Sequence, residues 1–383
     1  MFQVAVPLLA VRLTRSASAV ALVAVAGRLP WLLFALHAGA LADRLDRRRT
    51  MIVVNAARGA ALVGFAALVE ADVATLAWLY VLAFLLGVGE TLFDTSAQSI
   101  MPSVVRRDQL TRANGRLYAA ELTTNQFIGP PLGGAIAGVA LAWAFAGSGA
   151  AYVLAAVALL AVRGRFRAER HGPPTRLRSD IAEGLRYLWG HGLLRRLALL
   201  VGAMNLVASA AFALFVLFAV EPGPLGLSEL GFGVLLTAGA IGSLAGTVLA
   251  PRVEQRAGRR RVLVGAVALM GLPFLAVATT TSVVLVGATA AIGGAASVTW
   301  NVVTVSLRQR IVPDRLLGRV NSGYRLLAWG TMPLGAALGG LAGEVLGVRT
   351  VFGLAAAASV ALVWPALAIT DAAIDAAEGG DGA

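Results

Sequence analysis

Residues 39–49 read GALADRLDRRR, which places two acids and four arginines within the seven residues from Asp43 to Arg49. Predominantly apolar stretches flank this charged segment at 19–42 and 50–70. An α-helix needs roughly 20 apolar residues to cross the ~30 Å hydrocarbon core of a bilayer. The pattern therefore predicts two membrane-spanning helices joined by a short, highly charged connection.

The rest of the chain repeats this alternation of apolar and charged segments. The 383 residues are 58% hydrophobic and 14% charged, whereas a soluble domain carries about 25% charged residues. Helices are the natural spanning element because lipid offers no partner to backbone N–H and C=O groups, and the alternation typical of a membrane barrel strand is absent. The sequence predicts an all-α polytopic membrane protein with eleven spans, at 19–42, 50–70, 73–98, 114–138, 140–162, 195–219, 229–251, 260–280, 282–306, 318–342 and 348–369.

The formal net charge of +12 comes from arginine, since the chain has no lysine. The arginines gather in every second connection, around 44–49, 106–116, 163–196, 252–261 and 308–319, and the other connections hold only Arg12, Arg15 and Arg349. The positive-inside rule assigns arginine-rich connections to the cytoplasm. We therefore expect a multi-pass protein of the cytoplasmic membrane, with its central loop and C-terminus in the cytoplasm, whose basic character reports topology and no nucleic-acid partner.

An internal repeat divides the chain. A shift of 207 residues superposes Asn114 on Asn321 and Gly133 on Gly340, and the triplet Arg47–Arg49 matches Arg259–Arg261 after a five-residue insertion. The prediction is two parallel bundles of about six helices each. The expected domains are an N-terminal bundle at 1–162, a cytoplasmic linker at 163–194, a C-terminal bundle at 195–370 and an acidic flexible tail at 371–383.

Two segments of this plan leave alternatives open. The stretch IAEGLRYLWGHGLL in the linker places apolar residues on one face, which fits either an interfacial helix or a solvated linker helix. Only about eleven apolar residues precede Arg12, which is half a membrane thickness. We expect this partial first helix to reflect a misassigned start or a truncation, the alternative being a genuine half-helix.

Two motifs resemble those of a known superfamily. The charged segment resembles the signature loop G-x-L-a-D-R-x-x-R-R of the major facilitator superfamily, and the matching residues are Gly39, Leu41, Asp43, Arg44, Arg47 and Arg48. Asp46 stands where many members have glycine. GPPLGG at 129–134 resembles the fifth-helix motif of its proton-coupled drug exporters. The stretches PSVVRRDQLTRANG and NSGYRLLAWGTMPLGAALGG are similar to the branch of multidrug, macrolide and siderophore exporters called transmembrane secretion effectors.

The resemblance implies the major facilitator fold, alternating access, export of a small amphipathic organic molecule in exchange for protons, and action as a monomer without a cofactor. For Gly39, Asp43, Arg44, Arg47 and Arg48 it implies a cytoplasmic gate, the alternative being that the arginines only mark topology. For the fifth-helix motif it implies a bend that seals the outer half of the pathway, the alternative being a packing kink, and the residues concerned are Gly129, Pro130, Gly133 and Gly134.

Ionisable residues inside spans are costly and are functional candidates. Glu90 and Asp94 lie one helical turn apart, so one of them should be protonated more easily than normal. Glu121 is the third candidate for proton coupling. Asp94 has the alternative role of an ion-pair partner for Arg112 or Arg116. Polar and aromatic residues at plausible cavity positions are Asn125, Gln126, Asn205, Trp300, Asn301, Arg325 and Trp329, although tryptophan is also a common interface anchor.

Other functional classes find little support in the composition. A P-loop pump needs a lysine, and a thiolate metal site or disulfide needs cysteine; the chain has neither. Its three histidines, His37, His171 and His191, are far apart. We therefore expect no enzyme activity and no metal or other cofactor, with the bilayer, protons and a small-molecule substrate as partners. An uptake permease of the same superfamily and a non-transporting membrane protein remain as alternatives.

Overall fold

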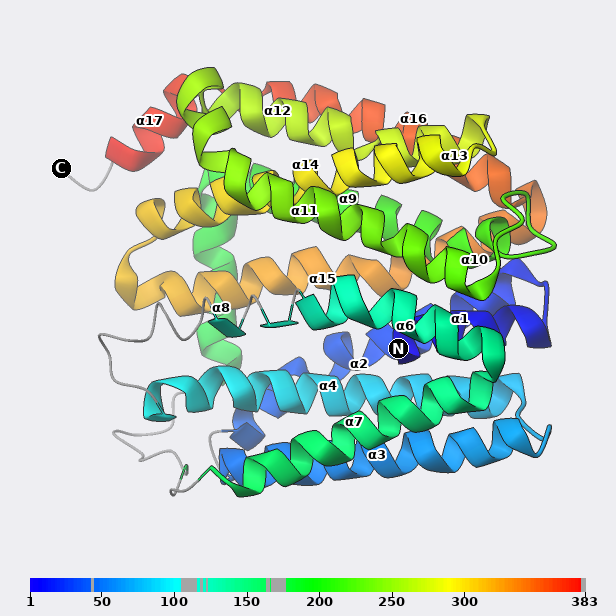
Figure 1. Ribbon diagram of the computed structural model, residues 1–383. Coiled ribbons are helices and arrows are strands. Elements are labelled where there is room, and N and C mark those ends of the chain that lie inside the picture. The colour runs from blue at the N-terminus through cyan, green and yellow to red at the C-terminus, as the bar shows by residue number, and fades with distance from the viewer. Residues whose placement is uncertain are drawn as a thin grey trace. The chain divides into compact units, whose positions relative to one another are not determined.

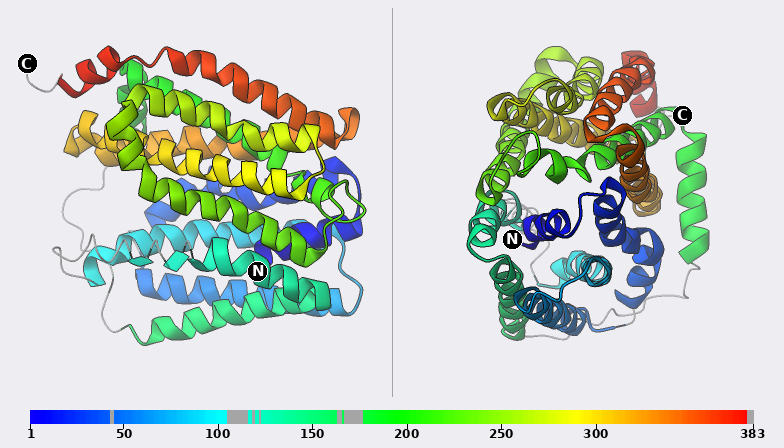
Figure 2. Two further views of the ribbon diagram at one scale, coloured as in Figure 1. Left: turned by 45° about the horizontal axis from the view of Figure 1, so that its top comes forward. Right: turned by 90° about the vertical axis from the view of Figure 1, so that its right-hand side faces the viewer.

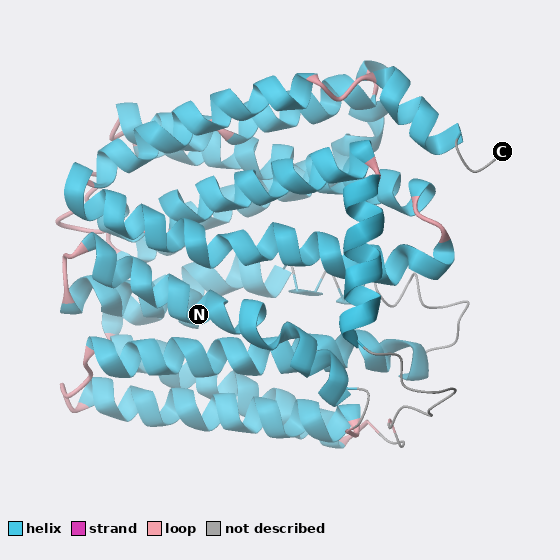
Figure 3. Ribbon diagram, turned by 180° about the vertical axis from the view of Figure 1, so that it is seen from behind, coloured by secondary structure: helices cyan, strands magenta, loops and turns pink. Residues whose placement is uncertain are grey.

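A computed structural model describes residues 1–42, 45–104, 116–117, 120–121, 123–162, 166 and 177–379. The regular structure of these residues is helical, and no strand occurs among them (Figure 3). Ten of the described helical segments are long and apolar enough to cross a membrane. The predicted all-α membrane architecture is therefore confirmed.

The chain forms two compact units. Unit 1 comprises Met1–Pro174 together with Ala219–Val234, and unit 2 comprises Thr175–Phe218 together with Leu235–Ala383. The short second segment of unit 1 includes the beginning of helix α11 (Glu229–Ala257), which continues in unit 2.

In unit 1 the long helices pair lengthwise. Helix α3 packs along α7 and α4, and α2 packs along α4, while the short α1 contacts α2, α4, α6 and α7 (Figure 1). A π-helical turn, η2, leads directly into α6. The elements are α1 (Phe2–Leu13), α2 (Ala17–Ala42), α3 (Arg47–Glu70), α4 (Leu76–Val104), η2 (Thr123–Ile128), α6 (Gly129–Val139) and α7 (Leu141–Leu160).

Unit 2 has the same kind of lengthwise pairing, with α15 along α9, α12 along α14 and α13 along α16. Helix α8 is the exception, because it runs crosswise over the ends of its neighbours α9 and α15 (Figures 1 and 2). The elements are α8 (Leu177–Gly190), α9 (Gly192–Phe212), α10 (Phe215–Ala219), α11, α12 (Arg259–Met270), α13 (Leu272–Thr279), α14 (Val283–Ile311), α15 (Asp314–Leu346), α16 (Val348–Leu367) and α17 (Asp371–Gly379).

Glycine contacts reproduce the sequence repeat. A Cβ on Gly87 of α4 would collide with the Gly27 carbonyl of α2, and a Cβ on Gly294 of α14 would lie 3.0 Å from the Gly239 carbonyl carbon of α11. Gly87 and Gly294 are 207 residues apart, which is the repeat shift. Small residues let helices approach closely in lipid, where van der Waals contact takes the place of the hydrophobic effect.

Several elements differ in detail from the expectation. The expected span 260–280 is divided between α12 and α13, because Pro273 lies in the first turn of α13 and cannot donate a backbone hydrogen bond to the preceding turn. The described part of the expected span 114–138 consists chiefly of η2 and α6. The expected flexible tail is helical as α17, and the expected linker contains α8.

Candidate functional site

The GPPLGG segment begins α6 and widens the turn before it. Pro130 and Pro131 occupy the first turn of α6 and donate no backbone hydrogen bond. The preceding turn is π-helical over Thr123–Ile128, a form that relieves the clash between a proline ring and the turn before it. A Cβ on Gly129 would lie 2.7 Å from the Thr124 carbonyl oxygen, so the widened turn needs a glycine there.

The next glycines bring three backbones together. A Cβ on Gly133 would lie 2.8 Å from the Met1 Cα, and a Cβ on Gly134 would lie 3.0 Å from the carbonyl carbon of Glu229 and overlap its oxygen. From the other side, a Cβ on Gly233 of α11 would lie 2.9 Å from the Pro130 carbonyl carbon. We call Gly133, Gly134 and Gly233 the glycine seam, because they join α6 to α1 and to the first turns of α11 within unit 1.

Charged residues from the arginine-poor connections flank the seam. The Arg12 guanidinium lies 2.8 Å from the Glu229 carboxylate, and Arg15 donates to the Glu221 carbonyl oxygen at 3.2 Å. The Arg12 side chain is 49% exposed, so the pair stabilises the contact by no more than about 1 kcal/mol. The sequence analysis missed this pair because its partners are 217 residues apart; the only signal was an arginine in an otherwise arginine-poor connection.

The charged segment that opens α3 makes a clasp at the other end of unit 1. Asp43 and Arg44 lie outside the described residues, and Gly39 falls within α2. Asp46 is the N-cap of α3, accepting from the Arg49 N–H at 2.9 Å. The Arg48 guanidinium donates to the carbonyl oxygens of Leu159 and Leu160 at 2.8 and 2.7 Å, at the C-terminus of α7.

Asp46 and Arg47 also tie this segment to the chain beyond α7. The Arg47 N–H donates to the Phe166 carbonyl at 3.3 Å, and the Phe166 N–H donates to the Asp46 carboxylate at 3.4 Å. An aspartate at the usual glycine position therefore has a capping role, which its place directly before a helix could have indicated.

Unit 2 has a corresponding clasp that uses an acidic side chain. Arg259, the repeat equivalent of Arg47, donates to Glu254 at 3.1 Å and to Glu378 at 2.7 Å. The other oxygen of Glu378 lies 3.5 Å from Arg310 of α14. Ile374 of the same helix α17 is 1% exposed within the apolar core of the unit. In both repeats, then, the arginine loop is tied to the segment that follows the last long helix of that repeat.

A buried arginine lies within unit 1. Arg58 of α3 is 7% exposed, and its guanidinium carbon lies 4.3 Å from the ring centroid of Tyr152 on α7. Its stem lies against Gly89 of α4, where a Cβ would be 2.7 Å from the Arg58 Cδ. The Arg58 Nε and the Oδ1 of Asn55, one turn away, have no hydrogen-bond partner among the described residues. A cation over an aromatic face retains part of its electrostatic stabilisation when it is desolvated.

The predicted proton-coupling residues of α4 share the surroundings of this arginine. Arg58, Glu90 and Asp94 all lie within electrostatic range of the Tyr152 hydroxyl. Glu90 is exposed and lies about 21 Å along α4 from its first residue, which is about two-thirds of the way along the candidate span Leu76–Ala97. Asp94 is partly buried and has a partner in the structure.

Three further predicted residues lie together around η2. Glu121, Asn125 and Gln126 are all exposed, with Glu121 in the helical residues just before the π-helix. The spacing of four residues places Asn125 roughly one turn after Glu121. This part of unit 1 thus presents a carboxylate and two amides outside the packed core.

The predicted residues of unit 2 separate into two groups. The Asn205 side chain donates to the Ala328 carbonyl oxygen at 2.7 Å. Trp329, the residue after Ala328, is exposed, and the guanidinium of Arg325, about one turn before Trp329, lies 5.3 Å from its ring centroid. Asn301 is exposed, whereas Trp300 is 3% exposed and belongs to the apolar core of the unit. Trp300 is therefore a core residue in this structure.

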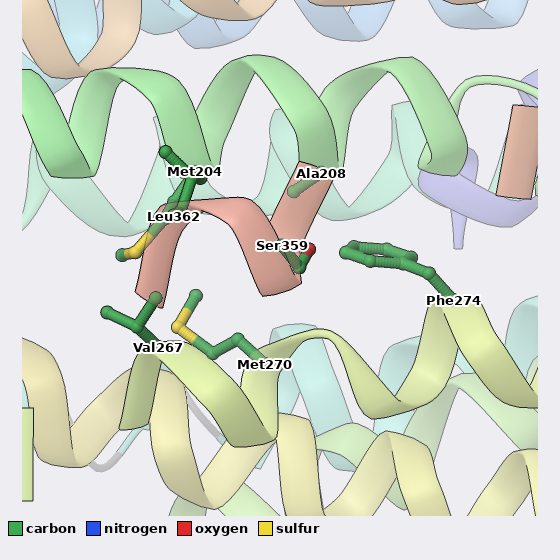
Figure 4. Close-up of a pocket in the computed structure, with 7 residues that line it drawn as sticks. All are labelled: Met204, Ala208, Val267, Met270, Phe274, Ser359 and Leu362. Atoms are coloured by element: carbon green, nitrogen blue, oxygen red, sulfur yellow. The ribbon is translucent and has the colours of Figure 1, made fainter. Parts of the chain in front are cut away.

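A small cavity within unit 2 does not qualify as a substrate site. It has a volume of about 20 Å³ and is lined mainly by apolar side chains such as Met204 and Phe274 (Figure 4). The one polar side chain in Figure 4, Ser359, donates to the Ala355 carbonyl oxygen. Pockets for organic ligands measure about 300–1,000 Å³, so this space is far too small. The described residues also contain no group of three or more potential metal ligands.

Comparison with known proteins identifies the family of this chain. The profile of the transmembrane secretion effector family matches residues 1–381. The multidrug efflux pump Tap of Mycolicibacterium fortuitum is 29% identical over 366 residues, covering 91% of this chain and 86% of that protein. Tap of Mycobacterium tuberculosis strain H37Rv is 30% identical over 364 residues, covering 91% of this chain and 84% of that protein.

Solved structures support the fold. A mutant of the nucleoside transporter NupG superposes with a TM-score of 0.73 at 12% identity, covering 92% of this chain and 91% of that chain. A bacterial homologue of the iron transporter ferroportin in its inward-facing state gives a TM-score of 0.63 at 17% identity, covering 96% and 98%. At these identities the likeness establishes the architecture alone, and it confirms the predicted major facilitator fold.

Proposed function

Because the chain belongs to the transmembrane secretion effector family of major facilitator transporters, we propose that it exports small amphipathic organic molecules, drugs among them, in exchange for protons. The observation that carries this proposal is the similarity to multidrug efflux pumps over 91% of the chain. The same similarity favours export over the uptake permease considered from the sequence. A transporter of this kind works by alternating access, in which each end of the pathway opens in turn.

The distribution of arginine supports an orientation for the cycle. The clasps built on Arg48 and Arg259 lie at the arginine-rich ends of their units, which we assign to the cytoplasm together with α8 and α17. The glycine seam and the Arg12–Glu229 pair then lie toward the outer side, and we call this the seam end of unit 1. In the proposed cycle the seam is closed while substrate enters from the cytoplasm or inner leaflet, and it parts for release.

The exposure of polar residues supports the assignment of the transport pathway. A charged side chain at the centre of a span costs about 2.5–3.5 kcal/mol if it faces lipid. Glu90 inside its candidate span and Glu121 beside η2 are exposed, and we infer that they face a water-filled part of the pathway. The proposed substrate contacts are Asn125 and Gln126 in unit 1 and Asn205, Asn301, Arg325 and Trp329 in unit 2.

We assign proton coupling to Glu90, Asp94 and Glu121, with Arg58 as a buried counter-charge. A positive charge near two carboxylates favours their ionised form, and the repulsion between the carboxylates opposes it. A proton taken up from outside by Glu90 or Glu121 weakens the hold on a cationic or polar substrate and assists release. Arg58 is buried and always charged, so it provides a fixed counter-charge throughout the proposed cycle.

Transport in proteoliposomes tests the proposal. The purified protein is reconstituted with the lipophilic dye ethidium as the probe, and dye movement is followed with and without an imposed pH gradient. We expect the gradient to accelerate dye movement toward the acidic side. Glu121→Gln should abolish this acceleration, whereas the matched variant Glu70→Gln, at the exposed end of α3, should behave like the parent.

Each part of the proposal would be contradicted by a different result. Equal dye movement with and without the gradient would refute proton coupling. Acceleration toward the alkaline side would refute export. Unchanged coupling in Glu121→Gln would remove that residue from the mechanism and leave Glu90 and Asp94.

A further inference from the structure

The corner between α8 and α9 presents two arginines and a tryptophan on its outer face. Arg186 and Arg195 are exposed, and Trp189 is 48% exposed. Helix α8 crosses the ends of α9 and α15 instead of running beside them, and both views agree on this course (Figures 1 and 2). A helix in this position lies parallel to the plane of the membrane if α9 and α15 span it.

The opposite face of α8 is fixed to unit 2. A Cβ on Gly184 would collide with the Arg319 carbonyl of α15, and Leu188 is fully buried. Glu183 forms an ion pair with Arg319, and the Tyr187 hydroxyl donates to the Ile311 carbonyl at 3.3 Å. The face that carries Arg186 and Trp189 is therefore held rigidly away from the unit, which a mobile linker helix would not achieve.

The depth of the corner follows from α9. Arg195 lies in the first turn of this candidate span, and its guanidinium donates to the Trp189 carbonyl at 2.9 Å. Leu199, one turn further on the same face of α9, is 50% exposed, as expected of a lipid-facing residue. Arg195 and Trp189 therefore lie where hydrocarbon gives way to headgroups, a depth that tryptophan prefers.

The chemistry of the corner selects an anionic ligand. Two exposed guanidinium groups can bind a phosphate in bidentate geometry, and the nearby acid Glu183 is already paired with Arg319. We propose that Arg186, Trp189 and Arg195 form a binding site for the headgroup of an anionic phospholipid in the cytoplasmic leaflet. Lipid is favoured over an acidic protein partner because the exposed tryptophan and Leu199 continue the surface into the hydrocarbon region.

Quenching of Trp189 by brominated lipids tests this site. The full-length protein is placed in nanodiscs that contain brominated phosphatidylglycerol or brominated phosphatidylcholine at equal mole fraction. The contribution of Trp189 is the difference between the parent and Trp189→Phe, since the chain has seven tryptophans. We expect phosphatidylglycerol to quench Trp189 more strongly than phosphatidylcholine, with a preference of about fivefold for each arginine that contacts the headgroup.

Charge variants separate the site from a general attraction to anionic membranes. The double variant Arg186→Gln/Arg195→Gln should lose the preference for phosphatidylglycerol. The matched double variant Arg252→Gln/Arg256→Gln, which removes two exposed arginines from the last turns of α11, should keep it. Thermal unfolding of each variant in phosphatidylcholine alone confirms that the comparison is between folded proteins.

Three results would overturn the proposal. Equal quenching by the two lipids would mean membrane contact without headgroup selection. No quenching of Trp189 by either lipid would place the corner in water, where a protein partner becomes the better explanation. If the two double variants lose the preference for phosphatidylglycerol equally, the preference reflects a general electrostatic attraction and not a site. None of these readouts depends on transport, so the proposed export function can fail without affecting them.

Discussion

The most direct test of the seam is to add one methyl group to it. A Cβ on Gly134 would overlap the Glu229 carbonyl oxygen and lie 3.0 Å from the Glu229 carbonyl carbon and the Leu230 Cα, whereas ordinary contact begins at 3.4 Å. In Gly134→Ala the α6 backbone and the start of α11 must move apart by about 0.5–1 Å to restore normal carbon–carbon separation. Overpacking of this kind costs about 1–3 kcal/mol.

The same helix offers a matched control. Gly138 lies one turn after Gly134 on α6, and a Cβ there would meet no atom within 4 Å. Replacing glycine by alanine within a helix also adds up to about 1 kcal/mol of helix stability. Both variants gain this helix stability, so the difference in effect between Gly134→Ala and Gly138→Ala reports the steric clash at the seam.

A cysteine reporter measures the opening. The chain has no native cysteine, so Ala137→Cys introduces a single thiol at a position of α6 that is 1% exposed. A cost of 1–3 kcal/mol shifts the closed–open equilibrium by about 5–150-fold. We expect a membrane-impermeant thiol reagent applied outside to modify Gly134→Ala faster by a factor in this range, and the export rate to fall. Gly138→Ala should stay close to the parent. Equal modification and equal export in the two glycine variants would refute the role of the seam as a closing contact.

Three further substitutions test the charged contacts. Arg12→Gln should weaken seam closure by less than about 1 kcal/mol, and a double-mutant cycle with Glu229→Gln that found no coupling would contradict the pairing. Arg58→Leu should leave the melting temperature unchanged or higher, because an apolar side chain replaces an incompletely paired buried charge. The same variant should lose pH-driven export. If proton coupling of export is retained in this variant, Arg58 has only a structural role. Glu378→Gln breaks two partly exposed ion pairs and should lower the free energy of unfolding of unit 2 by about 1 kcal/mol, measured by thermal unfolding. The control Asp375→Asn, on the same helix, should unfold like the parent.

The membrane architecture could be predicted from the sequence because lipid imposes one simple requirement on a long apolar segment. Ten of the eleven expected spans have a counterpart among the described helices. The exception, 114–138, contains the two prolines of GPPLGG, and its described part divides into η2 and α6. Apolar content alone does not reveal such a change of backbone form, although the prolines themselves marked its position.

The side-chain contacts were harder to predict, because they depend on which helices become neighbours. The pairing of Arg12 with Glu229 joins segments from different repeats, and the stacking of Arg58 on Tyr152 requires α3 to lie along α7. The composition of the acidic C-terminal segment suggested a flexible tail, yet α17 buries Ile374 and supplies Glu378 to the clasp of unit 2. A tail of few apolar residues can still be ordered when one of them reaches an existing core.

The two ends of unit 1 are closed by different kinds of contact, and this difference determines how each can open. Arg48 makes two hydrogen bonds to carbonyl oxygens, and water can replace both at a net cost of about 1.5–3 kcal/mol each, the value for a charged donor. The seam consists of backbone in van der Waals contact, where no polar exchange with water compensates for partial separation. A contact of this kind is lost over a fraction of an ångström, since a gap of 0.5–1 Å already forfeits a quarter to a half of the attraction. The arginine clasp can therefore loosen bond by bond, whereas the seam opens as a whole. In the proposed export cycle this difference suits the seam to the outer end of the pathway, where a leak would dissipate the proton gradient.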